Sequence, residues 1–168
     1  MPMMPRQGRG FDRAVRTDLD SLHADLTTGE EPIATEAMLV GLPAPVAQYL
    51  RYTGVVGKPL VRTIRVRQAG KIRPGTGRWM LLDALQYYRV NPPGFVWSGR
   101  IRLGPLTLGR ARDSYLHGRG RMLVRIASLV TVVDGRGAEM DQGSMMRYLS
   151  EMMFFPSAFL APTSPPTP

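Results

Sequence analysis

The sequence predicts an α+β domain: a twisted antiparallel β-meander of about four to five strands, with helices before it and one helix packed on it from the C-terminal side. Three observations indicate this fold. Apolar residues recur at helical spacing near both ends of the chain and at a period of two through its middle. Pro- and Gly-rich turns separate the middle segments. Sequential strands joined by such short turns favour an antiparallel meander over parallel βαβ units.

The N-terminal part is predicted to be helical. Residues 1–10 show no apolar pattern and are expected to form a disordered leader. An amphipathic helix followed by an acidic linker is expected over 11–36, because five apolar residues recur there at helical spacing. These are Phe11, Val15, Leu19, Leu22 and Leu26. A second, shorter helix is expected at 43–52, with a proline in its first turn and a glycine after its last.

The middle of the chain is predicted to supply the strands. They are expected at 60–73, 78–90, 95–103, 109–117 and 121–133. The clearest alternation lies in 95–103, which is expected to be buried on one face only. The residues expected to face the core are Phe95, Trp97, Ile101 and Leu103, and those expected to face solvent are Arg100 and Arg102.

The C-terminal part is predicted to hold one helix at 140–153, which Pro156 ends. Its apolar stripe needs a sheet to cover it. We therefore expect residues 37–160 to form a single domain and 161–168 to form a disordered Pro-rich tail.

Composition excludes several classes of site. The 168 residues contain no cysteine, so disulfides, thiolate metal sites and cysteine nucleophiles are excluded. The two histidines have no histidine partner at helical spacing, and the glycines match neither a dinucleotide fingerprint nor a phosphate loop. No metal and no cofactor are expected. No apolar leader or spanning segment is evident, so the expected location is cytoplasmic, with peripheral attachment to a membrane as the alternative.

The net charge of +9 is unevenly distributed. Residues 1–36 carry −3 and residues 37–168 carry +12, and 20 of the 22 basic residues are arginine. Such a basic domain is attracted to anionic surfaces at low salt. An anionic membrane surface is therefore an expected partner, whereas sequence-specific binding of nucleic acid is not expected.

Three polar residues share one predicted strand. Asp113, Tyr115 and His117 lie at i, i+2 and i+4, which puts their side chains on one face. A carboxylate, a phenol and an imidazole together can serve acid–base chemistry or hold a polar ligand. The alternative is the polar solvent face of an edge strand.

Three further residues complete the candidate ligand-binding set. Arg147 and Glu151 are one helical turn apart and are expected to form a surface ion pair. Trp97 belongs to a group of aromatic and methionine residues that suits a core or a pliable apolar cavity.

The pattern Asp-Gln-Gly-x-x-x-Arg-Tyr-Leu-x-Glu-x-x-(Trp/Phe)-Phe-Pro-x-Ala begins at Asp141. With upstream segments it resembles an uncharacterised bacterial domain-of-unknown-function family. These segments are 42–46, 49–54, 86–88, 93–97 and 113–122. Phe154 stands where similar proteins more often show Trp, and similar proteins continue past this segment into further strands. The chain therefore looks C-terminally truncated. Its layout is also similar to the half-barrels of lipoprotein carriers, and an incomplete half-barrel is expected.

These observations predict a non-enzymatic binding module that holds a hydrophobic or lipid-like ligand against a curved sheet. One alternative is an enzyme with a pocket formed by Asp113, Tyr115 and His117. The other is a basic peripheral protein that binds anionic membrane or nucleic acid. If strands are missing, an exposed sheet edge is expected to cause self-association.

Overall fold

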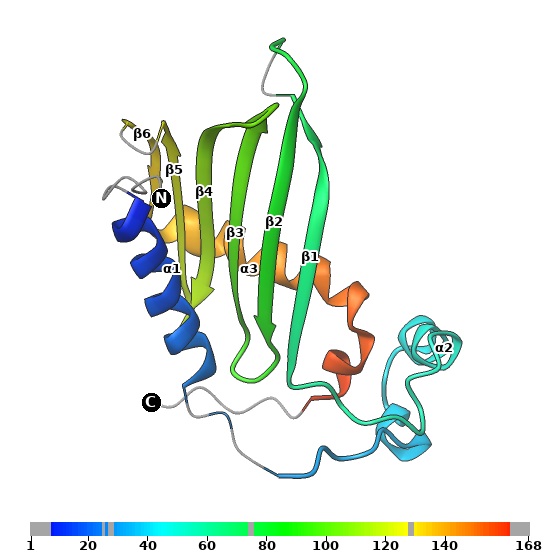
Figure 1. Ribbon diagram of the computed structural model, residues 1–168. Helices are drawn as coiled ribbons and strands as arrows, with labels where there is room; N and C mark the ends of the chain where they lie inside the picture. The colour runs from blue at the N-terminus through cyan, green and yellow to red at the C-terminus, as the bar shows by residue number, and fades with distance from the viewer. Residues whose placement is uncertain (1–7, 25, 27–28, 74–75, 128–129, 162–168) are drawn as a thin grey trace.

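The computed structural model describes residues 8–24, 26, 29–73, 76–127 and 130–161. One antiparallel sheet lies between two helices: α1 (Gly8–His23) crosses one face and α3 (Ala138–Glu151) crosses the other (Figure 1). The predicted α+β class is thereby confirmed. Most of the expected leader and tail lies outside the described residues, although α1 already begins at Gly8.

The sheet has six strands in sequential order, each antiparallel to the next, and it is not closed. They are β1 (Thr63–Ile72), β2 (Met80–Arg89), β3 (Gly94–Leu103), β4 (Leu106–Leu116), β5 (Arg119–Ile126) and β6 (Val130–Gly135). The sequence predicts about four to five strands because the apolar run over 121–133 indicates a single strand. In the structure the chain turns after β5, where Ala127 has a φ of 51°. Neither Gly nor Pro marks this turn, so the apolar run conceals it.

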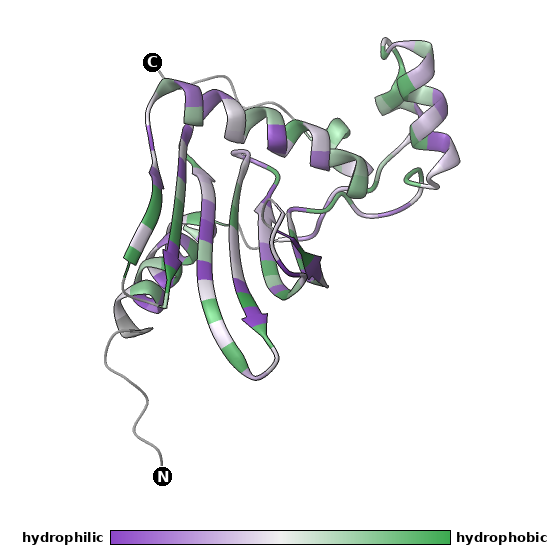
Figure 2. Ribbon diagram, turned by 90° about the horizontal axis from the view of Figure 1, so that it is seen from above, coloured by the Kyte–Doolittle hydropathy of each residue, from purple (hydrophilic) through white to green (hydrophobic). Residues whose placement is uncertain are grey.

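Short helical elements flank the sheet. Between α1 and β1 lie the 3₁₀ helix η1 (Glu36–Leu39) and the helix α2 (Ala44–Tyr52). After α3 come the 3₁₀ helices η2 (Met152–Phe154) and η3 (Pro156–Leu160). In the view from above, coloured by hydropathy, α3 runs along the sheet while α2 stands to one side of it (Figure 2).

Two apolar clusters hold these elements together. The larger lies between the sheet and the α3–η3 segment and is formed by Tyr88, Val90, Phe95, Tyr115, Tyr148, Phe155 and Ala158. The smaller holds η1 and α2 to the start of β1 and is formed by Ala34, Leu39, Ala47, Leu50, Val55 and Leu60.

The α3 helix approaches the sheet at a glycine. A Cβ atom at Gly120 would lie 2.3 Å from the Met140 carbonyl oxygen and 2.5 Å from Ser144 Oγ. Its backbone N–H donates to Asp141 Oδ1 at 2.7 Å. Asp141 of the sequence pattern therefore fixes the first turn of α3 against β5.

The prediction that β3 is buried on one face only is wrong. Phe95 is fully buried as expected, but Val96, on the opposite face, is only 1% exposed because α1 covers it. At the other end of β3, Leu103 is 41% exposed rather than in the core. The sheet is thus covered on both faces near α1, by α3 on one face and by α1 on the other, and the two faces present different side chains.

Candidate functional site

The face of the sheet beneath α3 carries a polar cluster centred on Arg147. Its Nε donates to Glu151 Oε1 at 3.0 Å, and a terminal nitrogen donates to Asp113 Oδ2 at 2.5 Å. A second terminal nitrogen lies 3.3 Å from Gln86 Oε1. The guanidinium also lies over the Phe95 ring, 4.9 Å from its centre. Arg147 therefore links α3 to β2, β3 and β4.

Amides and aromatic donors complete this cluster. Gln86 Nε2 and the Tyr88 hydroxyl each donate to Glu151 Oε2 at 2.8 Å. Gln68 Nε2 donates to Gln86 Oε1 at 3.1 Å, and Trp97 Nε1 donates to Gln68 Oε1 at 2.7 Å. Buried polar groups are stable when they are hydrogen-bonded in this way.

Burial governs the acid–base properties of the cluster. It raises the pKa of Asp113, although the Arg147 charge acts in the opposite direction. For Arg147, burial lowers the pKa, but the charges of Glu151 and Asp113 outweigh that effect and the net shift is upward. The pKa of Tyr88 is raised by burial and by its hydrogen bond to Glu151. The tyrosine and the arginine thus keep their protons, and the cluster can fasten α3 to the sheet.

The structure brings four of the six predicted site residues together. Trp97, Asp113, Arg147 and Glu151 belong to the Arg147 cluster, and Tyr115 lies nearby in the larger apolar cluster. The Arg147–Glu151 pair was expected on the surface, but it points toward the sheet.

His117 is placed elsewhere, so the prediction that it shares a face with Asp113 and Tyr115 is wrong. It lies beyond the end of β4, in the turn to β5, with a φ of 51°. Its Nε2 is 3.0 Å from Ser21 Oγ, next to α1 on the opposite side of the sheet.

Gln68, Gln86 and Tyr88 of the cluster were not predicted. Gln86 is fully buried. The signal was present in the alternation of β2, which places Gln86 between Ala84 and Tyr88 on the inward face. A glutamine at such a position needs hydrogen-bond partners.

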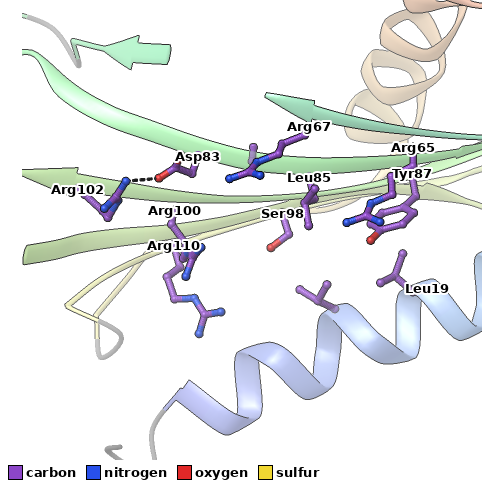
Figure 3. Close-up of a pocket in the computed structure, with 12 residues that line it drawn as sticks. Leu19, Arg65, Arg67, Asp83, Leu85, Tyr87, Ser98, Arg100, Arg102 and Arg110 are labelled. Carbon is purple, nitrogen blue, oxygen red and sulfur yellow. Dashed lines mark hydrogen bonds and ion pairs between the residues drawn. The ribbon is translucent and has the colours of Figure 1, made fainter. Parts of the chain in front are cut away.

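The opposite face of the sheet carries a groove beside α1, with a volume of about 580 Å³ (Figure 3). We call it the arginine groove. The residues that line it from the sheet include Arg65, Arg67, Asp83, Leu85, Tyr87, Ser98, Arg100, Arg102 and Arg110. From α1, Val15 and Leu19 add an apolar wall.

Positive charge exceeds negative charge in the arginine groove. Arg102 pairs with Asp83, and Arg110 pairs with Asp12 of α1. Within the described part of the chain, Arg65, Arg67 and Arg100 have no carboxylate partner, while Arg65 lies 5.7 Å from the centre of the Tyr87 ring.

The register places like charges side by side. Arg100 on β3 lies directly opposite Arg110 on β4, which lies directly opposite Arg125 on β5. Like charges at such positions destabilise a sheet. Among the described residues, Arg110 is the member of this row that pairs with a carboxylate, Asp12 of α1.

The groove was not predicted from the sequence, because each of these arginines was assigned to the solvent face of its own strand without regard to the neighbouring strands. A signal was available: the pattern Arg-x-Arg occurs in three of the five predicted strands, beginning at Arg65, Arg100 and Arg110. A period of two puts both arginines of each pair on one face. The strand pairing needed to bring the three pairs to the same face became known only from the structure.

Comparison with known families gives one match. The model of a family of unknown function (DUF6544) matches residues 32–164. The chain belongs to this family. The expected membership of an uncharacterised family is thereby confirmed, and the DUF6544 region contains the whole sheet, α2 and α3 but not α1. No curated protein and no solved structure matches the chain.

Two further observations concern the described residues of this DUF6544 chain. None of its described helices has the length and apolar character needed to cross a membrane. Among the same residues, no three acidic or histidine side chains gather in a way that could hold a metal ion.

Proposed function

We propose that this chain is a non-catalytic binding module whose arginine groove holds an anionic amphiphile, that is, a ligand with an anionic headgroup and an apolar portion. The observation that carries the proposal is the presence of Arg65, Arg67 and Arg100 in one groove without carboxylate partners among the described residues. Guanidinium groups suit phosphate and carboxylate groups because they donate two parallel hydrogen bonds.

The size and lining of the groove support an amphiphilic ligand. Its volume of about 580 Å³ falls in the range of small-molecule sites, roughly 300–1,000 Å³. Leu19 of α1 faces Leu85 and Tyr87 of the sheet across it (Figure 3), and Val15 of α1 also lines the groove. These side chains offer an apolar surface next to the arginines, so a headgroup and the start of an acyl chain can be held together.

The proposal retains a lipid-like ligand against the sheet but puts it on the face opposite to the residues predicted from the sequence. In the Arg147 cluster the arginine already pairs with two carboxylates, Asp113 and Glu151, so an added anion would gain little there. The arginine groove offers guanidinium groups without carboxylate partners among the described residues instead.

Titration calorimetry on the full chain tests the proposal. Dodecyl phosphate below its micellar concentration is the amphiphilic probe, inorganic phosphate is the headgroup alone, and vesicles of phosphatidylglycerol or phosphatidylcholine represent a membrane source. We expect dodecyl phosphate to bind more tightly than inorganic phosphate, and binding to weaken with salt. Tighter binding to phosphatidylglycerol than to phosphatidylcholine vesicles would identify the ligand as a membrane lipid and support a peripheral location. If the ligand is a free amphiphile, the chain should bind dodecyl phosphate but show no preference between the two kinds of vesicle.

Two double variants localise the site. Arg67→Gln with Arg100→Gln should weaken binding of dodecyl phosphate at least about tenfold, since each charge-assisted hydrogen bond contributes roughly 1.5–3 kcal/mol. The control is Arg51→Gln with Arg78→Gln, which removes the same charge from exposed positions away from the groove. Equal weakening in both double variants would show that binding depends on net charge and would reject the groove.

Self-association through the edge of the sheet is a second proposal, favoured by β6. This edge strand exposes Val130 and Val132 at 59% and 48%, and such an edge can pair with another copy. Sedimentation velocity should show dimers that Val132→Lys removes. A monomer at all concentrations would reject this proposal.

A further inference from the structure

Helix α1 lies across a face of the sheet that is rich in arginines, which we call the arginine face. Its arginines come from β1, β3, β4 and β5. They are Arg65, Arg67, Arg100, Arg102, Arg110, Arg112, Arg121 and Arg125. On one side of α1 is the arginine groove, and on the other is a smaller groove of about 200 Å³ lined by Arg112, Arg121 and Arg125. Helix α1 crosses this face of the sheet (Figure 1), and arginines line the grooves on both sides of it.

Two carboxylates of α1 occupy the middle of this surface. Asp12 pairs with Arg110, and Asp18 Oδ2 lies 3.3 Å from Arg112 Nε. The Arg112 side chain is only 3% exposed. Burial raises the pKa of Asp18, with Arg112 and Arg121 acting against it, and burial lowers the pKa of Arg112. Both charges therefore lose solvation in this pair, which reduces what the pair contributes.

The carboxylates of α1 leave many donors of the arginine face unsatisfied. Within the described residues, five of its arginines have a buried Nε that forms no hydrogen bond with another protein group, and for Arg112 this holds although Asp18 Oδ2 lies 3.3 Å away. These are Arg102, Arg110, Arg112, Arg121 and Arg125. A ligand headgroup with several oxygens could accept hydrogen bonds from these Nε–H groups. The two carboxylates of α1 are held at fixed positions on the helix and do not accept them. Unsatisfied buried donors cost free energy, so such a ligand would have an advantage over α1.

Helix α1 is anchored more firmly at its C-terminal end. Buried Arg89 donates to the carbonyl oxygens of Leu22 and Ala24, at 3.2 Å and 2.5 Å. A guanidinium at the C-terminal end of a helix also interacts favourably with the negative end of the helix dipole. The N-terminal end is held by Asp12 and by Phe11, whose ring lies 4.6 Å from the Arg110 guanidinium. Both of these contacts depend on Arg110.

We propose that α1 is an internal competitor for the arginine face. An anionic ligand displaces Asp12 and Asp18 from Arg110 and Arg112, and the N-terminal part of α1, with Val15, lifts away while Arg89 keeps its C-terminal end in place. The apolar contacts of the bound ligand then come from Leu85 and Tyr87 of the sheet. The binding surface then extends from the arginine groove to the arginines beneath the helix. This inference rests on the proposed function, because an anionic ligand is required. The position of α1 outside the residues matched to the family is consistent with a separate regulatory element.

The first test removes the competing charges in the full chain. Asp12→Asn with Asp18→Asn should tighten binding of dodecyl phosphate about tenfold, which corresponds to ~1.4 kcal/mol. The matched control is Asp20→Asn with Glu30→Gln, which makes the same change in net charge at exposed positions. Its affinity should stay within about twofold of the unaltered chain.

The second test follows the movement of α1 directly. The chain has no cysteine, so a single introduced thiol reports on one position. Phe11 and Leu22 are both buried, at 3% and 2% exposed. In Phe11→Cys, saturating dodecyl phosphate should speed modification by a thiol reagent at least about tenfold. In Leu22→Cys, beside the Arg89 anchor, the rate should change little.

The outcomes separate this inference from the proposed function. Suppose that the unaltered chain binds dodecyl phosphate. The competitor model is then overturned if the Asp12/Asp18 variant binds no more tightly than its control, or if the thiol of Phe11→Cys stays protected at saturation. In either case α1 is a permanent wall of the site. If neither the unaltered chain nor the Asp12/Asp18 variant binds, both proposals fail. Binding by the Asp12/Asp18 variant with none by the unaltered chain would support competition in its strongest form.

Discussion

The two faces of the sheet both bury polar side chains, but they balance charge differently. Under α3, Arg147 meets Asp113, Glu151 and Gln86, and each carboxylate has donors in the cluster. Under and beside α1, arginines outnumber carboxylates, and some lie directly opposite one another.

We interpret this difference as one between a structural network under α3 and the proposed binding site beside α1. A polar network whose members satisfy one another stabilises one arrangement of helix and sheet. A surface that holds excess charge of one sign is destabilised by its own repulsion, and binding an opposite charge relieves that repulsion. We therefore expect substitutions under α3 to change stability, and those on the arginine face to change binding. The following variants test that contrast.

The largest effect is expected for Arg147→Gln. It leaves Asp113 without its charged partner in a buried position, and the loss should be about 3 kcal/mol of unfolding free energy, since breaking a buried pair costs roughly 3–5 kcal/mol and Arg147 is partly exposed. Urea denaturation at an unchanged m-value measures it. A loss below about 1 kcal/mol would show that the cluster does not fasten α3.

A second large effect is expected for Gly120→Ala. The added Cβ would meet the Met140 carbonyl oxygen at 2.3 Å, so α3 must shift, at a cost of roughly 1–3 kcal/mol. Gly143→Ala is the matched control, because its Cβ would meet nothing within 4 Å and alanine favours a helix by about 1 kcal/mol. Thermal unfolding should thus shift in opposite directions; shifts in the same direction would contradict the close approach of α3 to β5.

An intermediate, pH-dependent effect is expected for Asp113→Asn. Burial raises the folded-state pKa of Asp113 above its ordinary value of 3.8, so the folded chain binds this proton more tightly than the unfolded chain. Ionisation of Asp113 therefore costs the native protein stability as pH rises from about 4 toward the folded-state pKa. The stability of Asp113→Asn relative to the unaltered chain should increase over that interval in urea titrations. A relative stability that decreases with rising pH would mean that Arg147 outweighs burial.

The smallest effect on stability is expected for Arg100→Gln. Arg100 is exposed, has no carboxylate partner among the described residues and lies opposite Arg110, so its removal should change the unfolding free energy by less than about 0.5 kcal/mol or raise it. The same variant should weaken binding of dodecyl phosphate. A loss of stability comparable to that of Arg147→Gln would remove the distinction between the two faces.

The positions of helices and strands were predicted from the sequence more accurately than the contacts between them. Period and turn residues placed α3 and four of the strands within a few residues, because these signals are local. The turn at Ala127 has no such marker, and β6 was missed. Val96 is buried because α1, a segment distant in sequence, packs on it. The alternation of residues within β3 gives no information about that contact.

The candidate sites show the same limit. Asp113, Arg147 and Glu151 were selected for their chemistry, and the fold brought them together. The sheet also buried Gln86, whose polar side chain did not suggest an inward position. The arginine face was unrecognised because it depends on the register of four strand pairs.

The most direct test of the contrast between the faces follows individual arginines by NMR. In a titration of the full chain with dodecyl phosphate, we expect the Nε–Hε signals of Arg65, Arg67 and Arg100 to shift and that of Arg147 to stay unchanged. Saturable shifts at the first three with none at Arg147 would support an anion site on the α1 face. Shifts that are largest at Arg147, or absent from all four, would contradict it.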